Sequence, residues 1–186
     1  MTCSLDGLAK REMKVLAHAE AIAGTMEDKE LLLRADGTFA ESAAIHADYV
    51  ALAAGPWNPE ALEALKRAVF LGWYAAAEPS CFTGIDDLDE AVLQREFDLL
   101  LATVRDERLD DEFEAMLGWY VQVASYAFTG RSGGDGLKVA NVADELIRDL
   151  RTFDGHAYKR IPFRRTDLER RGQMGVYWIS IACRPD

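Results

Sequence analysis

Signals that start and stop helices recur along the first 150 or so residues of the chain. Thr38 and Glu41 have the spacing of a capping box, in which each side chain accepts a hydrogen bond from the other residue's backbone N–H. Gly55-Pro56 is a typical helix stop, and Asn58-Pro59 is a typical start with proline in the first helical position. Because such signals alternate with apolar stripes, they predict many helices joined by short links.

Apolar residues spaced by three or four positions mark the helices themselves. The clearest stripe joins Leu62, Leu65, Val69 and Trp73. Seven helical segments are predicted in this way, with approximate limits 8–22, 25–36, 38–54, 59–78, 86–104, 110–128 and 139–150. Seven helices with short links predict a mainly α fold, an antiparallel multi-helix array.

The end of the chain differs in composition. Val176–Cys183 is rich in β-branched and aromatic residues and predicts a strand, and Tyr158–Phe163 is a weaker candidate for its partner. Pro162 places that partner at a sheet edge. An isolated hairpin is marginally stable in water. We therefore expect a helical domain over residues 1–155 and a C-terminal β-hairpin within residues 156–186, packed on the helices.

One short motif pair is repeated. Leu71–Tyr74 recurs as Leu117–Tyr120, and Phe82–Gly84 recurs as Phe128–Gly130, both with an offset of 46 residues. A shared offset predicts an internal duplication of a helix pair. Two copies are too few for a stable solenoid, which favours a duplicated pair inside a compact bundle.

The repeated motif carries two aromatic pairs, Trp73 with Tyr74 and Trp119 with Tyr120. A ligand pocket between the two helices is one interpretation of these pairs. Packing in the core is the favoured one, because aromatic side chains dominate core burial. The glycine before each tryptophan weakens a helix by about 1 kcal/mol relative to alanine. We therefore expect both glycines, Gly72 and Gly118, at close helix–helix contacts.

The net charge of −11 comes from 21 basic and 32 acidic side chains. This balance argues against nucleic acid as a partner. Residues 1–135 hold 11 basic and 25 acidic side chains, whereas residues 136–186 hold 10 and 7. Even complete pairing between the two parts would leave an acidic excess. We expect a negative helical face made by two helix starts, Asp86, Asp87, Asp89 and Glu90, and Asp110, Asp111, Glu112 and Glu114. Helix capping and solubility are the alternative explanations of these acids.

No catalytic group emerges from the motifs. Gly130–Gly134 matches the G-x-S-x-G pattern, and Asp154 and His156 follow it. The nucleophile of that motif needs a strand before it, but a helix is predicted there. A flexible linker explains the match better.

Metal, cofactor and membrane sites are not predicted either. His18, His46 and His156 lack the spacing of metal ligands. The acidic helix starts lack the alternating ligands of a calcium loop. No stretch has the roughly 20 apolar residues of a membrane span, and the first residues lack a signal-peptide core.

The three scattered cysteines, Cys3, Cys81 and Cys183, fit a reducing cytoplasm. These features favour a cytoplasmic, non-enzymatic protein-interaction module whose acidic helical face binds a basic partner. An inhibitor or immunity-type protein is one example, by analogy of charge alone. The alternative is an enzyme or small-ligand-binding protein with its pocket between the two Trp-Tyr helices.

Overall fold

The computed structural model describes residues 4–128 and 147–183, and helices dominate this part of the chain, with no strand in it. The prediction of a mainly α fold is therefore confirmed. Residues 147–150 are helical. The other elements are α1 (Leu5–Ala21), α2 (Met26–Ala35), α3 (Thr38–Ala53), α4 (Pro59–Ala77), α5 (Ser80–Thr83), α6 (Glu90–Arg105), α7 (Asp111–Ala124), η1 (Ser125–Phe128), η2 (Ala157–Arg160), α9 (Arg165–Leu168) and α10 (Gly172–Ala182).

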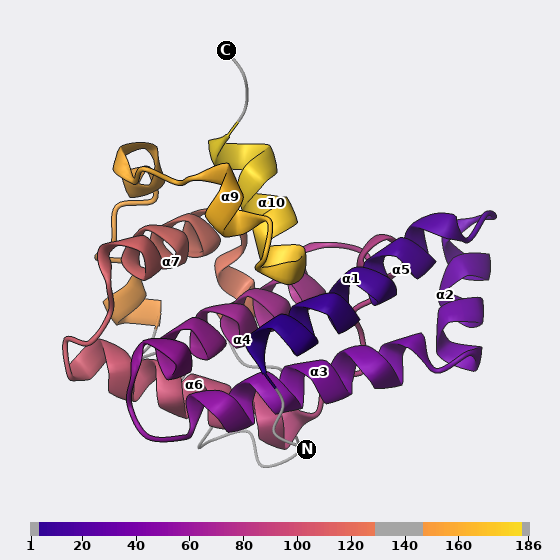
Figure 1. Cartoon of the computed structure of the whole chain (residues 1–186), viewed down its shortest axis with the longest axis horizontal. Coiled ribbons are helices and arrows are strands. Elements are labelled where there is room, and N and C mark those ends of the chain that lie inside the picture. Colours follow the sequence, from indigo (N-terminus) through magenta and orange to yellow (C-terminus); the bar gives the residue numbers. More distant parts are fainter. Residues whose placement is uncertain (1–3, 129–146, 184–186) are drawn as a thin grey trace.

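Helix α4 lies at the centre of the arrangement. It packs against α3 along most of its length and also contacts α6, α7 and α10. Helix α1 lies across α3 and α10. Figure 1 shows α2 at one end of the molecule, where it joins α1 to α3, and the C-terminal helices α9 and α10 at the top of the view.

Local capping explains why several helices begin where they do. Asn58 precedes α4, its side chain accepts a hydrogen bond from Ala61 N–H at 2.9 Å, and Pro59 takes the first helical position as predicted. The start of α3 differs from the predicted capping box. The Thr38 hydroxyl and N–H both donate to Asp36, and Gly37 at φ 85° precedes the helix.

The predicted C-terminal β-hairpin is wrong. Val176–Cys183 belongs to α10 and its C-cap, and Tyr158–Phe163 forms one 3-10 turn followed by an extended stretch. Met174 and Trp178, four residues apart, are both fully buried. That spacing places both on one face of a helix, and β-propensity gives way where packing favours the helix. The C-terminal residues 156–183 therefore add helices to the array.

The predicted internal duplication is not supported either. Trp73 is buried and Trp119 is half-buried, so the two tryptophans have different surroundings. Helix α4 packs mainly against α3, whereas α7 contacts α4, η1 and η2. The second copy of the shorter motif, Phe128–Gly130, extends beyond the described residues, as does most of the predicted helix 139–150. The two copies of the motif therefore have different surroundings in the fold.

Both glycines of the repeat do lie at close contacts. A Cβ on Gly72 would come within 3.0 Å of Oε1 of Glu96 on α6. A Cβ on Gly118 would come within 2.8 Å of the backbone oxygen of Asp154. The second neighbour is a loop, not a helix, but in both places the missing side chain permits close packing.

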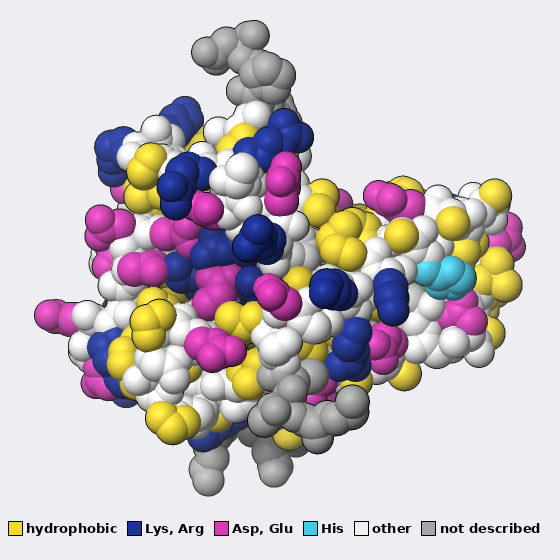
Figure 2. All heavy atoms as spheres, in the orientation of Figure 1, with side chains coloured by type: hydrophobic (Ala, Val, Ile, Leu, Met, Phe, Trp, Pro, Cys, Tyr) yellow, Lys and Arg dark blue, Asp and Glu magenta, His cyan; other side chains and the backbone are white. Residues whose placement is uncertain are grey.

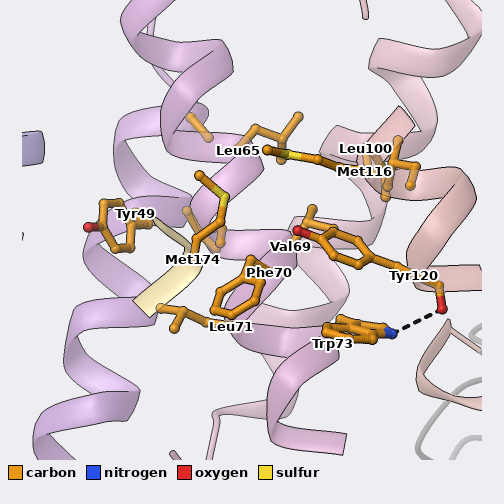
Figure 3. Packing of buried hydrophobic residues seen from close by; sticks show 14 of the residues in the cluster. Tyr49, Leu65, Val69, Phe70, Leu71, Trp73, Leu100, Met116, Tyr120 and Met174 are labelled. Atoms are coloured by element: carbon orange, nitrogen blue, oxygen red, sulfur yellow. Dashed lines mark hydrogen bonds between the residues drawn. The ribbon is translucent and has the colours of Figure 1, made fainter. Parts of the chain in front are cut away.

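The core is continuous along α4 and fills the space between the helices. Figure 3 shows Phe70, Leu71 and Trp73 of α4 among side chains of α3, α6, α7 and α10. The indole of Trp73 donates a hydrogen bond to the backbone oxygen of Tyr120 at 3.1 Å. Among the described residues, none of the helices combines the length and the apolar character that crossing a bilayer requires.

Candidate functional site

The acids before α6 are largely used inside the protein. Arg34 of α2 forms ion pairs with Asp86 at 3.1 Å and with Asp87. Asp89 caps α6, accepting hydrogen bonds from two backbone N–H groups of its first turn at 2.8 and 3.0 Å. Glu90 follows as an exposed first residue of the helix. Capping and ion pairing thus account for most of this predicted patch.

The acids at the start of α7 divide into two pairs. Asp110 caps the helix and binds Lys66 at 2.6 Å, and Glu112 binds the same ammonium at 2.9 Å. Asp111 and Glu114 are exposed and make no hydrogen bond or ion pair within the described part of the chain. Only the second pair is available to a partner.

The two predicted acidic patches do not form one face. They flank α6, whose 16 residues span about 24 Å. The two patches are therefore separate surfaces.

Asp111 and Glu114 open onto a pocket between α7 and η2. Its volume is about 420 Å³. Alongside them lie Asp154 and Arg160, which form an ion pair of 2.8 Å. The lining is completed by Ala115, Thr152, Phe153, Ala157 and Ile161. We call this set the acidic pocket.

The charges of the acidic pocket do not cancel. A hydrogen bond from His156 N–H and the ion pair with Arg160 lower the pKa of Asp154, so this carboxylate is ionised at neutral pH. Its charge is balanced by Arg160, whereas Asp111 and Glu114 add two acidic groups with no balancing cation on the pocket wall. The arrangement is suited to an organic cation.

A second polar cluster lies inside the protein, where the sequence patterns did not predict one. Glu12 of α1 is 2% exposed and accepts hydrogen bonds from the Tyr49 hydroxyl at 2.5 Å and from Gln173 N–H at 3.0 Å. The second bond ties α1 to the first turn of α10. Burial raises the pKa of Glu12 to about 7, although both hydrogen bonds oppose the shift.

Ion pairs extend this cluster towards α7. Arg67 donates to the Tyr49 hydroxyl and, at 2.7 Å, to Glu63. Arg171, which precedes α10, binds Glu63 and also Glu112 at 2.8 Å. Figure 2 shows basic and acidic side chains side by side in the middle of this face. The network holds the C-terminal helix against α1, α4 and α7.

Glu12 makes a pH-dependent contribution to stability. Its pKa is about 7 in the folded protein against an ordinary value of 4.5, so folding takes up a proton between these pH values. The contribution is greatest below pH 4.5 and falls by about 3 kcal/mol as pH rises to 7. We expect the unfolding free energy of the wild type, minus that of Glu12→Gln, to fall by about this amount over that range. Urea unfolding at a series of pH values measures it, and a difference independent of pH would contradict it.

One sequence signal does point to Glu12. It lies on the buried stripe of α1 between Leu8 and Val15, at a position where an apolar residue is expected. The same signal marks His46 and Glu96. These two side chains are 0% and 1% exposed and share a hydrogen bond of 2.5 Å between Nε2 and Oε2. An acidic or basic residue on an otherwise apolar stripe thus indicates a buried side chain with a hydrogen-bond partner.

The aromatic pairs of the alternative pocket pack into the core. The rings of Trp73 and Tyr120 are stacked with centroids 4.5 Å apart, and both residues are buried. Tyr74 and Trp119 are half-buried at the edge of the same cluster, where the Trp119 indole donates to the Tyr177 hydroxyl at 2.9 Å. The rings of Trp73 and Tyr120 pack directly against each other and leave no cavity between them (Figure 3).

Within the described residues, three or more His, Cys, Asp or Glu side chains do not gather as metal ligands would. Cys81 and Cys183 are free thiols. Comparison with protein-family models, curated proteins and solved structures finds no match to this chain.

Proposed function

We propose that this protein is a cytoplasmic, non-enzymatic interaction module whose acidic pocket receives a lysine or arginine side chain of a basic protein partner. The observation that carries the proposal is the presence of two carboxylates, Asp111 and Glu114, without internal partners at a pocket of about 420 Å³. Of the other acids in the two predicted patches, all but Glu90 are engaged in caps and ion pairs, and Glu90 does not line this pocket, so the pair stands out.

The walls of the acidic pocket suit a long basic side chain. Phe153, Ala157 and Ile161 offer apolar surface to its aliphatic part, while the carboxylates face its charge. A guanidinium group can satisfy two carboxylate oxygens at once, which favours arginine over lysine. The net charge of −11 adds a field that speeds the approach of a basic partner.

A pair of blocked pentapeptides tests the proposal, Ala-Ala-Arg-Ala-Ala and the same peptide with citrulline at the centre. In an NMR titration we expect the arginine peptide to shift amide signals of the first turn of α7 and of residues 153–161. The double variant Asp111→Asn/Glu114→Gln should weaken its binding at least five-fold, and added salt should weaken it in the wild type, because salt screens exposed charges.

The matched control is Glu27→Gln/Glu90→Gln, which removes two exposed acids outside the pocket. Binding of the arginine peptide to this variant should change less than two-fold. Equal weakening in the two double variants would show that net charge alone attracts the peptide. Equal shifts with the citrulline peptide would contradict a site for a cation.

A further inference from the structure

A second pocket has the opposite charge character. It lies between α1 and the junction of α9 and α10, shares no lining residue with the acidic pocket, and has a volume of about 520 Å³. Residues of both walls line it: Asp6, Ala9, Lys10, Met13 and Lys14 of α1, with Glu169, Arg170 and Gly172 opposite. We call it the α1 groove.

Three cations border the α1 groove. Lys10 and Lys14 are one helical turn apart on α1, and Arg170 approaches from the other wall. All three are exposed and form no hydrogen bond or ion pair with the residues that the structure describes. This is unexpected in a chain of net charge −11, where acidic partners are plentiful.

Two acids also border the groove. Glu169 is engaged with Arg165 at 3.5 Å. Asp6 lies one turn before Lys10, towards the start of α1. With Glu169 engaged, three cations face one free acid across the groove, so its charge is positive overall.

The surface between these charges is apolar. Ala9 is buried, and Met13 is 38% exposed, which is large for an apolar side chain. The stems of the lysines add aliphatic surface, and a methionine side chain adapts to irregular ligands. In Figure 2, Lys and Arg side chains lie along α1 beside a hydrophobic patch.

One wall of the groove is less suited to an anion. Gly172 lines it at φ 61°, and a Cβ on it would come within 2.5 Å of the Glu12 carboxyl group. The carboxyl group of Glu12 thus lies directly behind Gly172. A ligand with one anionic end would place its apolar part towards Gly172 and its charge towards the exposed cations.

We propose that the α1 groove binds an amphiphilic carboxylate of the medium-chain fatty acid type. Its alkyl chain lies on Ala9 and Met13, and its carboxylate is held by Lys10, Lys14 and Arg170. A pocket of about 520 Å³ that combines an apolar strip with charged groups along its border has the size of small-molecule sites. The site is distinct from the acidic pocket and needs no basic protein partner.

Binding of decanoate, decanol and decyltrimethylammonium to the full chain tests the proposal. By calorimetry and NMR, decanoate should bind most tightly and shift amide signals of residues 9–14 and 168–172. Lys10→Glu/Lys14→Glu should weaken decanoate at least ten-fold and leave decanol within two-fold. Met13→Asp should weaken both ligands, because it removes the apolar contact.

The control Arg95→Glu/Lys159→Glu makes the same change in net charge at exposed positions outside the groove. It should bind decanoate within two-fold of the wild type. Equal loss in the two double variants, a preference for the cationic amphiphile, or shifts elsewhere in the chain would overturn the proposal. Binding of a glutamate-rich peptide in the absence of decanoate binding would overturn it as well, in favour of a protein ligand.

Discussion

Replacing Glu96 with alanine is expected to destabilise the protein by about 3–5 kcal/mol. Glu96 and His46 are each other's hydrogen-bond partner at a junction of α3, α4 and α6, and both are almost fully buried. Removing the carboxylate leaves the imidazole without that bond in an apolar site, which costs far more than the pair contributes when intact. Urea unfolding followed by circular dichroism measures the loss.

The double variant His46→Leu/Glu96→Leu separates this explanation from simple loss of volume. Replacing a whole buried pair by apolar side chains is often neutral or stabilising. We therefore expect the double variant to recover most of the stability lost in Glu96→Ala. A double variant as unstable as the sum of His46→Leu and Glu96→Leu would show no coupling between the two side chains and would contradict this explanation.

Gly175→Ala is the second change with a large expected effect, about 3 kcal/mol of destabilisation. A Cβ at this position would lie 1.8 Å from the backbone oxygen of Leu168, so α9 and α10 would have to move apart. Overpacking of this kind forces backbone shifts, and a backbone atom cannot rotate out of the way as a side chain can. Because Trp178 lies one turn further along α10 and is fully buried, its fluorescence should report the displacement.

Gly7→Ala provides the matched control for Gly175→Ala. Gly7 also lies in a helix, and a Cβ there would meet only the Ser4 hydroxyl at 3.2 Å. Alanine is the better helix former by about 1 kcal/mol. We expect Gly7→Ala to be neutral or mildly stabilising. A comparable loss of stability in both variants would contradict the packing explanation.

Helix boundaries were predictable because they depend on neighbours within three or four residues. The cap of Asn58 on α4 and that of Asp110 on α7 both act over three residues, and both are present. The error at Thr38 is also local. Asp36 accepts the hydrogen bond from Thr38 N–H that the capping box would have directed to Glu41, and the Thr38 hydroxyl donates to Asp36 instead of accepting from Glu41 N–H. Asp36 and Glu41 are both close enough in the sequence to accept from Thr38 N–H, and residue spacing alone does not show which of them does so.

The error at the C-terminus has a different cause. Val176–Cys183 has the composition of a strand, but Trp178 is held by contacts that come from distant residues. Its indole donates to the Tyr120 hydroxyl at 2.9 Å, and its ring stacks on Phe163. These contacts favour the helical spacing of buried residues over the local preference for β-structure.

The candidate site shows the same division. Composition and the acidic helix starts were enough to predict an excess of negative charge, because charge is a property of the residues themselves. Which acids remain available was decided by partners far away in the chain. Lys66 and Arg171 neutralise Asp110 and Glu112, whereas Asp111 and Glu114 reach no cation in the described structure.

The sequence by itself thus determined a helical chain, the ends of several helices and the sign of the net charge, since each depends on local hydrogen bonds or on counting. Only the tertiary structure decided that Glu12 is buried with a raised pKa and that Asp111 and Glu114 face a pocket. It also decided that Lys10 and Lys14 border a groove. Those outcomes depend on which helices pack against each other. That packing joins residues separated by up to about 160 positions in the chain, as in the hydrogen bond from Gln173 N–H to Glu12.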